Sequence, residues 1–244
     1  MQKISIVSPV YNGQECIERL VKKIRFYINK YTTNFEIILI DDASKDNSWN
    51  VIKKLKKKYK FLKGIKLNKN YGQHKAIYAG LKYSTGDIII IMDSDLQDNP
   101  KYILKFYKEY KKHHLVIGVN EHKKKFNLMR LYSDIFWVIL TFLSFINFKR
   151  NISNYAITSR EIVNKYLKSN SIGFFYGELK TMKLKINYIK IKRNKRYLGK
   201  SSYNFIKCIK LAISHIIEYN IINKFFFSQF KKKYLNYPKV KLFI

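Results

Sequence analysis

The sequence is poor in cysteine, proline and glycine, which excludes several classes of protein. Its two cysteines, Cys16 and Cys208, are far apart and in no metal-ligand or redox spacing, so neither a disulfide framework nor a zinc site is predicted. Nine glycines and three prolines in 244 residues leave little room for a long linker or a low-complexity segment. We expect a globular chain with one large domain, or one domain and an appendage, in a reducing compartment such as the cytosol.

Long apolar runs are also missing. The N-terminus passes from Met1 directly into a strand-like segment, without the apolar core and cleavage site of a signal peptide. The longest apolar stretch, Ile135 to Phe148, is interrupted by polar residues and falls short of the roughly 20 residues that span a bilayer. No transmembrane helix is therefore predicted, and a cytoplasmic location is expected.

Acidic residues are scarce too, since 16 Asp and Glu stand against 49 Lys and Arg, for a net charge of +33. Such an excess favours a negative partner: nucleic acid, a diphosphate-bearing substrate or an anionic membrane face. A composition bias across a genome rich in Lys, Asn and Ile would explain much of it equally well. Because the basic residues are dispersed and no nucleic-acid-binding motif is present, a nucleic-acid-binding module is disfavoured.

The first 120 residues alternate β-branched runs with segments of helical pattern. Helices are predicted near Glu15–Asn29, Ser48–Lys58 and His74–Tyr83, and strands at Ile4–Val7, Phe35–Ile40, Gly64–Leu67, Ile88–Met92 and Leu115–Val119. Strands separated by such helices indicate βαβ units. The run Ile88–Met92 is apolar on both faces, which is typical of a central parallel strand. The sequence predicts an α/β fold, with a mostly parallel central sheet flanked by helices.

The pattern changes after about Phe126, to aromatic-rich helical stretches with a short segment near Tyr155–Thr158, a helix from about Arg160 and a strand at Ile186–Ile191. From Phe205 to Phe230 apolar residues recur at helical spacing, which predicts an amphipathic helix. Residues 1–204 are thus predicted to form the main domain, and residues 205–244 a C-terminal amphipathic helix and basic tail. Phe225-Phe226-Phe227 beside Lys231-Lys232-Lys233 suits a membrane surface, and packing on the domain is the alternative.

Polar residues collect after the predicted strands, at the edge where parallel sheets bind ligands. Five of the 16 acids lie in two such clusters, Asp41 with Asp42, and Asp93 with Asp95 and Asp98. Asp93 and Asp95 are two apart in an extended segment, so both can reach one ion. Their oxygens suit Mg²⁺ or Mn²⁺, with substrate phosphate in the open positions. A divalent-cation site is predicted; surface carboxylates or a helix cap are the alternatives.

Two other strand ends carry candidates for nucleotide binding. One of Asp41 and Asp42 can serve the local turn, which leaves the other for a base or ribose. The turn Asn70-Tyr71-Gly72-Gln73 precedes a helix whose N-terminal amides favour an anion, and Lys75 adds charge there. A helix cap without a ligand is the alternative. No histidine has the Ser or Cys partner of a nucleophilic triad, so nucleophilic catalysis of that kind is not indicated.

Four strings, in this order and spacing, resemble the family 2 glycosyltransferases, which have the GT-A fold. They are Ser8-Pro9-Val10-Tyr11-Asn12, Ile40-Asp41-Asp42-Ala43-Ser44, Asn70-Tyr71-Gly72-Gln73-His74, and Thr85-Gly86-Asp87 through Met92-Asp93-Ser94-Asp95-Leu96-Gln97-Asp98. The Leu-Gln-Asp string and Arg196-Tyr197-Leu198-Gly199-Lys200-Ser201-Ser202-Tyr203 are similar to the polyprenyl-phosphate branch, the group of dolichyl-phosphate mannose synthase and undecaprenyl-phosphate sugar transferases. The likeness is strong over residues 3–119, patchy over 150–204 and absent beyond.

The resemblance implies a metal-dependent enzyme that moves a sugar from a nucleotide-diphosphate donor, with inversion at the anomeric carbon. The donor candidates are Pro9, Tyr11, Glu15 and Asp42 by resemblance, with Asp41, Asn70, Gly72 and Lys75 from the strand ends. By resemblance, Asp93 and Asp95 bind the Mg²⁺ or Mn²⁺ ion and the diphosphate, Gln97 assists the metal, and Arg196, Lys200 and Ser201 contact phosphates. Asp93, Asp95 and Arg196 are the catalytic candidates. For the basic group, a general cationic surface is the alternative.

The acceptor implied by the resemblance is a polyprenyl phosphate at the cytoplasmic face of an anionic membrane, to which the enzyme would attach peripherally. Such a phosphate is already ionised, so no general base is needed, whereas a hydroxyl of a growing lipopolysaccharide or capsule glycan would need one, with Glu178 as candidate. Asn154 and Ala156 replace a carboxylate and a cation usual in the family, which leaves acceptor handling open. The two C-terminal membrane helices of many members are not seen here. The sequence also leaves a homo-oligomer open.

Overall fold

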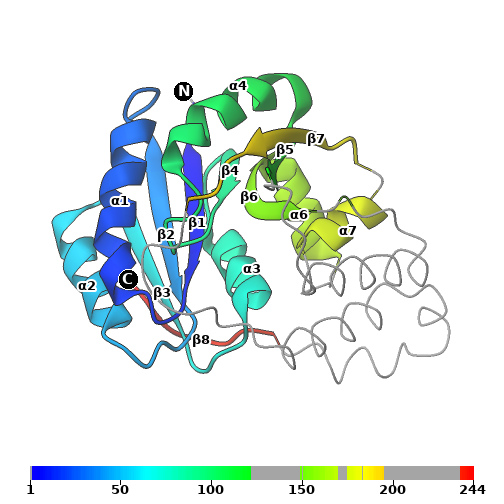
Figure 1. Cartoon of the computed structure of the whole chain (residues 1–244). Coiled ribbons are helices and arrows are strands. Elements are labelled where there is room, and N and C mark those ends of the chain that lie inside the picture. Colours follow the sequence, from blue (N-terminus) through cyan, green and yellow to red (C-terminus); the bar gives the residue numbers. More distant parts are fainter. Residues whose placement is uncertain (1, 122–148, 150, 170–174, 183, 195–236) are drawn as a thin grey trace, which may run out of the picture.

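The computed structural model describes residues 2–121, 149, 151–169, 175–182, 184–194 and 237–244. In this part of the chain an eight-stranded sheet has the order β7-β5-β6-β4-β1-β2-β3-β8. The strands are β1 Ile4–Val10, β2 Phe35–Asp41, β3 Leu62–Leu67, β4 Ile88–Ile91, β5 Leu115–Asn120, β6 Ile152–Ser159, β7 Asn187–Ile191 and β8 Val240–Phe243. Figure 1 shows this sheet between two sets of helices.

Helices cover both faces of the sheet. They are α1 Gln14–Ile28, α2 Ser48–Lys58, α3 Gln73–Tyr83, α4 Ile103–His113 after a 3₁₀ turn at Pro100–Tyr102, α6 Arg160–Lys168 and α7 Phe175–Thr181. Side chains of α1, α2 and α4 share one buried cluster with Ile88 and Ile90, and those of α3, α6 and α7 share another with Ile89 and Ile91. Because alternate residues of a strand face opposite sides, β4 is buried on both faces, as predicted.

The strand directions bring several chain ends to one edge of the sheet. Strands β1, β2, β3 and β4 are mutually parallel. Strand β6 is antiparallel to β4 and to β5, and β7 is parallel to β5, so β5 and β7 run in the direction of β4. The carboxyl ends of β1, β2, β4 and β7 therefore lie at the same edge as the amino end of β6. The predicted α/β fold with a mostly parallel sheet is confirmed.

Three elements are absent from the sequence prediction. Helix α4 follows Asn99, whose Oδ1 accepts the N–H of Lys101 at 3.0 Å, and Pro100 at the start of the turn. Helix α7 is short, with seven residues. Strand β8 pairs antiparallel with β3, so residues 237–244 lie against the sheet. The division at residue 204 stays a prediction, because residues 195–236 lie outside the described part.

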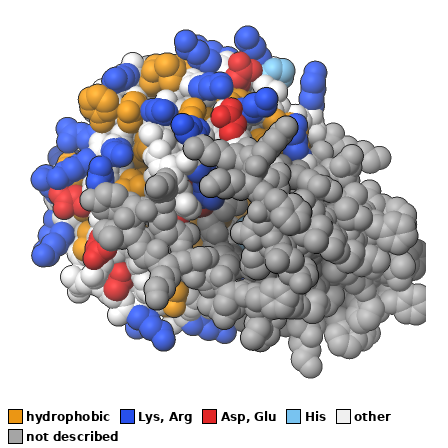
Figure 2. All heavy atoms as spheres, in the orientation of Figure 1, with side chains coloured by type: hydrophobic (Ala, Val, Ile, Leu, Met, Phe, Trp, Pro, Cys, Tyr) orange, Lys and Arg blue, Asp and Glu red, His pale blue; other side chains and the backbone are white. Residues whose placement is uncertain are grey.

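The charge of the molecule is spread over its surface. Figure 2 shows Lys and Arg side chains across the described part of the visible face, interleaved with apolar and acidic ones. This agrees with the dispersed basic residues of the sequence. The carboxylates that the fold buries are therefore exceptions that need local explanations.

Glu36 is one such carboxylate, at the amino end of β2 and 2% exposed. Its Oε1 accepts hydrogen bonds from the Ser5 hydroxyl at 2.6 Å and the Thr85 N–H at 2.7 Å. Its Oε2 lies 3.2 Å from the ammonium of Lys3 and 2.7 Å from that of Lys63. Burial alone would raise the pKa of Glu36, but these ion pairs and hydrogen bonds outweigh it and lower the pKa to about 2.

Replacing Glu36 by Gln is expected to lower the free energy of unfolding at pH 7 by about 3 kcal/mol, from a pKa change of 4.5 to about 2. Because the folded pKa is depressed, this contribution is complete above about pH 4.5 and is lost as the pH falls towards 2. Urea unfolding from pH 7 to pH 2 should show the two proteins converging. Glu18→Gln, at an exposed pair with Lys22, is the control and should change little. A difference in the free energy of unfolding that does not change with pH would contradict the assignment of this stability to the ionised carboxylate of Glu36.

Candidate functional site

A largely buried carboxylate lies at the centre of the carboxyl edge of the sheet. Asp93 follows β4, and its side chain is 15% exposed. Its Oδ1 accepts hydrogen bonds from the side-chain amides of Gln73, on the first turn of α3, and Asn154, on β6. Its Oδ2 accepts one from Nη2 of Arg193, two residues after β7, at 3.0 Å. The strand directions thus bring three separate segments to one side chain.

A second carboxylate, Asp98, is joined to the first. Its Oδ2 accepts the backbone N–H of Asp93 at 3.2 Å, and its Oδ1 accepts the hydroxyl of Ser153 at 3.2 Å. Nε of Arg193 lies 3.3 Å from the same Oδ1 as an ion pair. The side chain of Asp98 is fully buried. One guanidinium therefore bridges two carboxylates that burial would otherwise leave uncompensated.

The predicted metal ligands Asp93, Asp95 and Gln97 lie in a single turn. Oδ1 of Asp95 accepts the N–H of Gln97 at 3.1 Å, across Leu96, which is buried and left-handed with φ 62°. Asn194 braces this turn, because its N–H donates to the carbonyl of Gln97 at 3.0 Å and its amide to that of Leu96 at 3.3 Å. A non-glycine residue at positive φ persists only where its surroundings hold it. The turn is thus held by the segment after β7.

Several carboxylates lie close together at this turn. Burial raises the pKa of Asp93, and the charge of Asp98 raises it further, against the lowering by Arg193. Burial also raises the pKa of Asp98, again opposed by Arg193. The charge of Asp95 raises the pKa of both carboxyl groups as well. A further positive charge would therefore be favoured at this point of the edge.

A divalent cation fits this donor set. Carboxylate oxygens are the ligands that Mg²⁺ and Mn²⁺ prefer. Among the residues that the structure describes, no group of three or more His, Cys, Asp or Glu side chains is placed to hold a metal ion. The assignment of Asp93 and Asp95 as ligands, with help from Gln97, stays a prediction.

The two carboxylates at the end of β2 hold different loops. Oδ1 of Asp41 accepts the N–H of Ser44 at 3.1 Å, which closes the local turn. The carboxylate of Asp42 accepts the N–H groups of Tyr71 at 2.7 Å and Gly72 at 2.8 Å, and thereby fixes the loop before α3. Burial raises the pKa of Asp42, while these two bonds lower it. Oδ2 of Asp41 is buried and has no hydrogen-bond partner among the described residues.

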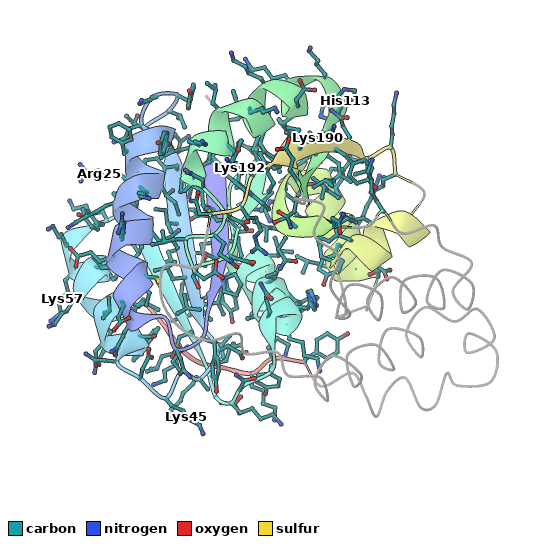
Figure 3. The ribbon with its side chains drawn as sticks, viewed as in Figure 1. Arg25, Lys45, Lys57, His113, Lys190 and Lys192 are labelled. Carbon is teal, nitrogen blue, oxygen red and sulfur yellow. The ribbon has the colours of Figure 1, made fainter. Side chains whose placement is uncertain are left out.

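The other predicted donor residues lie around this loop and the start of α1. Gly72 has φ 90°, which glycine adopts readily, and a side chain there would be strained. Asn70 is exposed, Lys75 half-buried in the first turn of α3, Tyr11 half-buried, and Glu15 exposed in the first turn of α1. Pro9 is buried within β1. Lys45 and Lys192, labelled in Figure 3, mark the loop after β2 and the end of β7. The roles of Pro9, Tyr11, Glu15, Asn70, Gly72 and Lys75 toward a nucleotide stay predictions.

Several predicted residues cannot be placed. Arg196, Lys200 and Ser201 lie outside the described residues, as does the predicted helix Phe205–Phe230. Glu178 is half-buried on α7, and its role as a base stays a prediction. Its helix lies near the carboxylates, since burial and the charges of Asp98 and Asp93 raise the pKa of Tyr176.

The sequence prediction missed the partners of Asp93. Arg193 follows the predicted strand Ile186–Ile191, so the strand-end rule, applied to that strand, would have indicated it. Gln73 was placed in the turn before α3 without a role. Asn154 was noted as a departure from the family pattern, and the structure places it against Asp93.

Sequence comparisons agree with this geometry. The model of the family described as Glycosyl transferase family 2 matches residues 5–167. Undecaprenyl-phosphate 4-deoxy-4-formamido-L-arabinose transferase of Photorhabdus laumondii is 31% identical over 218 residues. The match covers 86% of this chain and 66% of the relative, so the chain spans just under two thirds of the relative's length.

Solved structures share the fold. Glucosyl-3-phosphoglycerate synthase from Mycobacterium tuberculosis, in complex with Mn²⁺, UDP and glucosyl-3-phosphoglycerate, matches with a TM-score of 0.62 at 16% identity, over 88% of this chain and 79% of its own. A mannosyltransferase from Pyrobaculum calidifontis, in complex with GDP-Man and Mn²⁺, matches with a TM-score of 0.58 at 14% identity, over 88% and 62%. The predicted GT-A fold is confirmed.

Proposed function

Since the chain belongs to glycosyl transferase family 2, we propose that it moves a sugar from a nucleotide-diphosphate donor to a polyprenyl phosphate, with inversion at the anomeric carbon. The relative from Photorhabdus laumondii carries the name of an undecaprenyl-phosphate sugar transferase, which supports this acceptor. The observation that carries the proposal is the turn at the carboxyl edge that gathers the carboxylates of Asp93, Asp95 and Asp98.

The donor would lie between this turn and the loop fixed by Asp42. Oδ2 of Asp41, buried without a partner among the described residues, suits an N–H or O–H of the base or ribose. The N–H groups at the start of α3 favour the diphosphate. Asp93 and Asp95 would hold a Mg²⁺ or Mn²⁺ ion, which supplies charge neutralisation for the leaving nucleoside diphosphate. The acceptor phosphate is ionised at neutral pH, so no residue needs to remove a proton.

A second acceptor, a hydroxyl of a growing surface glycan, is favoured by the start of β6. Asn154 donates to Asp93, and Ala156 is buried, so these positions present no cation to a lipid phosphate. A hydroxyl would need a general base, for which Glu178 is the candidate. The two acceptors therefore differ in their dependence on Glu178.

A transfer assay tests both acceptors. The enzyme is mixed with a panel of radiolabelled nucleotide sugars and with either undecaprenyl phosphate or a glycan, and the product is identified by its mass. We expect a sugar-phosphate lipid, and Glu178→Gln is expected to leave its formation within about threefold, because no proton is removed. A glycan product that needs Glu178 would favour the second acceptor. No transfer and no donor hydrolysis with any donor would contradict both.

The proposal includes peripheral attachment to the inner face of an anionic membrane through residues 205–233. None of the helices in the described ranges is both long and apolar enough to cross a bilayer. Lysines near an anionic surface contribute about 1 kcal/mol each, and an apolar helical stripe adds burial among the headgroups. We expect the protein to float with anionic vesicles but not with neutral ones. Replacing Lys231, Lys232 and Lys233 by Gln should reduce this flotation. Protein that stays at the bottom of the gradient at low salt would refute attachment.

A further inference from the structure

Arg193 occupies an unusual place among the cations of this chain. Its guanidinium lies between the two buried carboxylates of the edge, 3.0 Å from Oδ2 of Asp93 and 3.3 Å from Oδ1 of Asp98. Its own side chain is 30% exposed, so one part faces the carboxylates and another part faces outward. Burial lowers the pKa of Arg193, but the charges of Asp98 and Asp93 raise it by more, so the guanidinium stays charged.

The backbone around Arg193 is fixed to the same turn that it neutralises. The N–H of Lys192 donates to the hydroxyl of Tyr102 at 3.1 Å. On the other side, Asn194 donates to the carbonyls of Gln97 and Leu96. The backbone on both sides of Arg193 is therefore held in place. An exposed lysine on a loop would lack this anchoring.

The oxygen that Arg193 binds belongs to the carboxylate assigned above to the cation and diphosphate. A guanidinium at Oδ2 of Asp93 and a divalent ion at the same carboxylate repel each other, since both are positive and the site is poorly solvated. The diphosphate of the donor, by contrast, offers the guanidinium a new anionic partner. Arg193 thus faces two alternative partners, the carboxylates before the donor binds and the diphosphate afterwards.

We propose that Arg193 is an exchangeable counter-ion of the Asp93 turn: it pairs with Asp93 and Asp98 in the free enzyme, disfavours a cation that arrives without the donor, and transfers to the donor diphosphate. The proposal rests on the proposed function for the identity of the donor. It makes Arg193 a positioning residue that links cation binding to diphosphate binding. Arg193 would thereby keep the free enzyme from holding a tightly bound ion.

The test measures Mn²⁺ binding to the free enzyme, by electron paramagnetic resonance of the unbound ion, without any donor or acceptor. Arg193→Gln is expected to bind Mn²⁺ about tenfold more tightly than the wild type, because one positive charge beside the site is removed. Arg193→Lys retains the positive charge beside the site and is therefore expected to stay within about threefold of the wild type. Lys192→Gln removes the same charge one residue earlier, on an exposed side chain, and should change the affinity less than twofold.

Arg193→Gln leaves two buried carboxylates without their counter-ion, so it is checked by circular dichroism and thermal unfolding. If it does not fold, the double variant Arg193→Gln with Asp98→Asn removes one carboxylate as well and takes its place. That variant should still bind Mn²⁺ more tightly than Asp98→Asn alone. Unchanged or weaker Mn²⁺ binding in a folded variant would overturn the proposal and leave Arg193 as a structural brace. Because no sugar is transferred in this experiment, its result is independent of which acceptor the enzyme uses.

Discussion

Replacing Asp95 by Asn is expected to lower the turnover number at least about a hundredfold, comparable to the loss of a principal electrostatic stabiliser in other enzymes. Its carboxylate lies in the turn with Asp93 and Asp98, and its Oδ1 accepts the N–H of Gln97. An amide in its place can retain that hydrogen bond but loses the charge. The expected defect therefore lies in the chemical step and in cation binding, with the fold preserved.

Steady-state kinetics with and without a chelator tests this expectation. The wild type should lose activity in chelator and regain it with Mg²⁺ or Mn²⁺, while Asp95→Asn should stay slow in both conditions. Asp87→Asn is the matched control, because Asp87 precedes β4 at the opposite end of the strand, where its Oδ2 accepts the N–H of Lys3 at 2.8 Å. Full activity of the wild type in chelator would show that the carboxylates of the turn serve another purpose.

Most of the sheet was predictable because its signal is local. The run at Ile88–Met92 is apolar on both faces, those at Ile4–Val7 and Phe35–Ile40 each contain one polar residue, and helices cover both faces in the structure. Strand β8 has four residues and depends on pairing with β3, which is distant in the sequence, so no local pattern indicates it. Helix α4, by contrast, has a proline at its start and apolar residues at helical spacing, and its signal was available.

The site was predictable to the extent that strand order follows from parallel pairing. Asp41, Asp42, Asp93 and Asp95 were placed together because the carboxyl ends of parallel strands share an edge. The partners of these carboxylates were not predictable in the same way. Arg193 reaches Asp93 only because β6 is antiparallel to both β4 and β5, which returns β7 to the direction of β4. Asp42 was predicted as a nucleotide ligand. In the structure, each of its two carboxylate oxygens accepts a hydrogen bond from a backbone N–H group.

That arrangement of Asp42 leads to a second large effect, on donor binding. Replacing Asp42 by Ala is expected to weaken donor affinity at least about tenfold and to change kcat much less, since the residue is assigned to nucleotide binding and not to the breaking bond. The physical reason is that Tyr71 and Gly72 lose the acceptor of their N–H groups, so the loop before α3 is no longer held in position. Calorimetry with the donor found in the transfer assay measures the affinity directly.

Gly72→Ala should produce a similar loss by a different cause, because a side chain is strained at φ 90°. If both substitutions act by displacing the same loop, the double variant Asp42→Ala with Gly72→Ala should be little worse than either single one. If Asp42 instead contacts the nucleotide directly, the two losses should add. Tyr71→Phe is the control, because it removes the hydroxyl that contacts Asn68 and Lys239 but keeps the N–H that Asp42 accepts. Donor affinity that is unchanged in Asp42→Ala would exclude both roles and leave Asp42 as a purely structural residue.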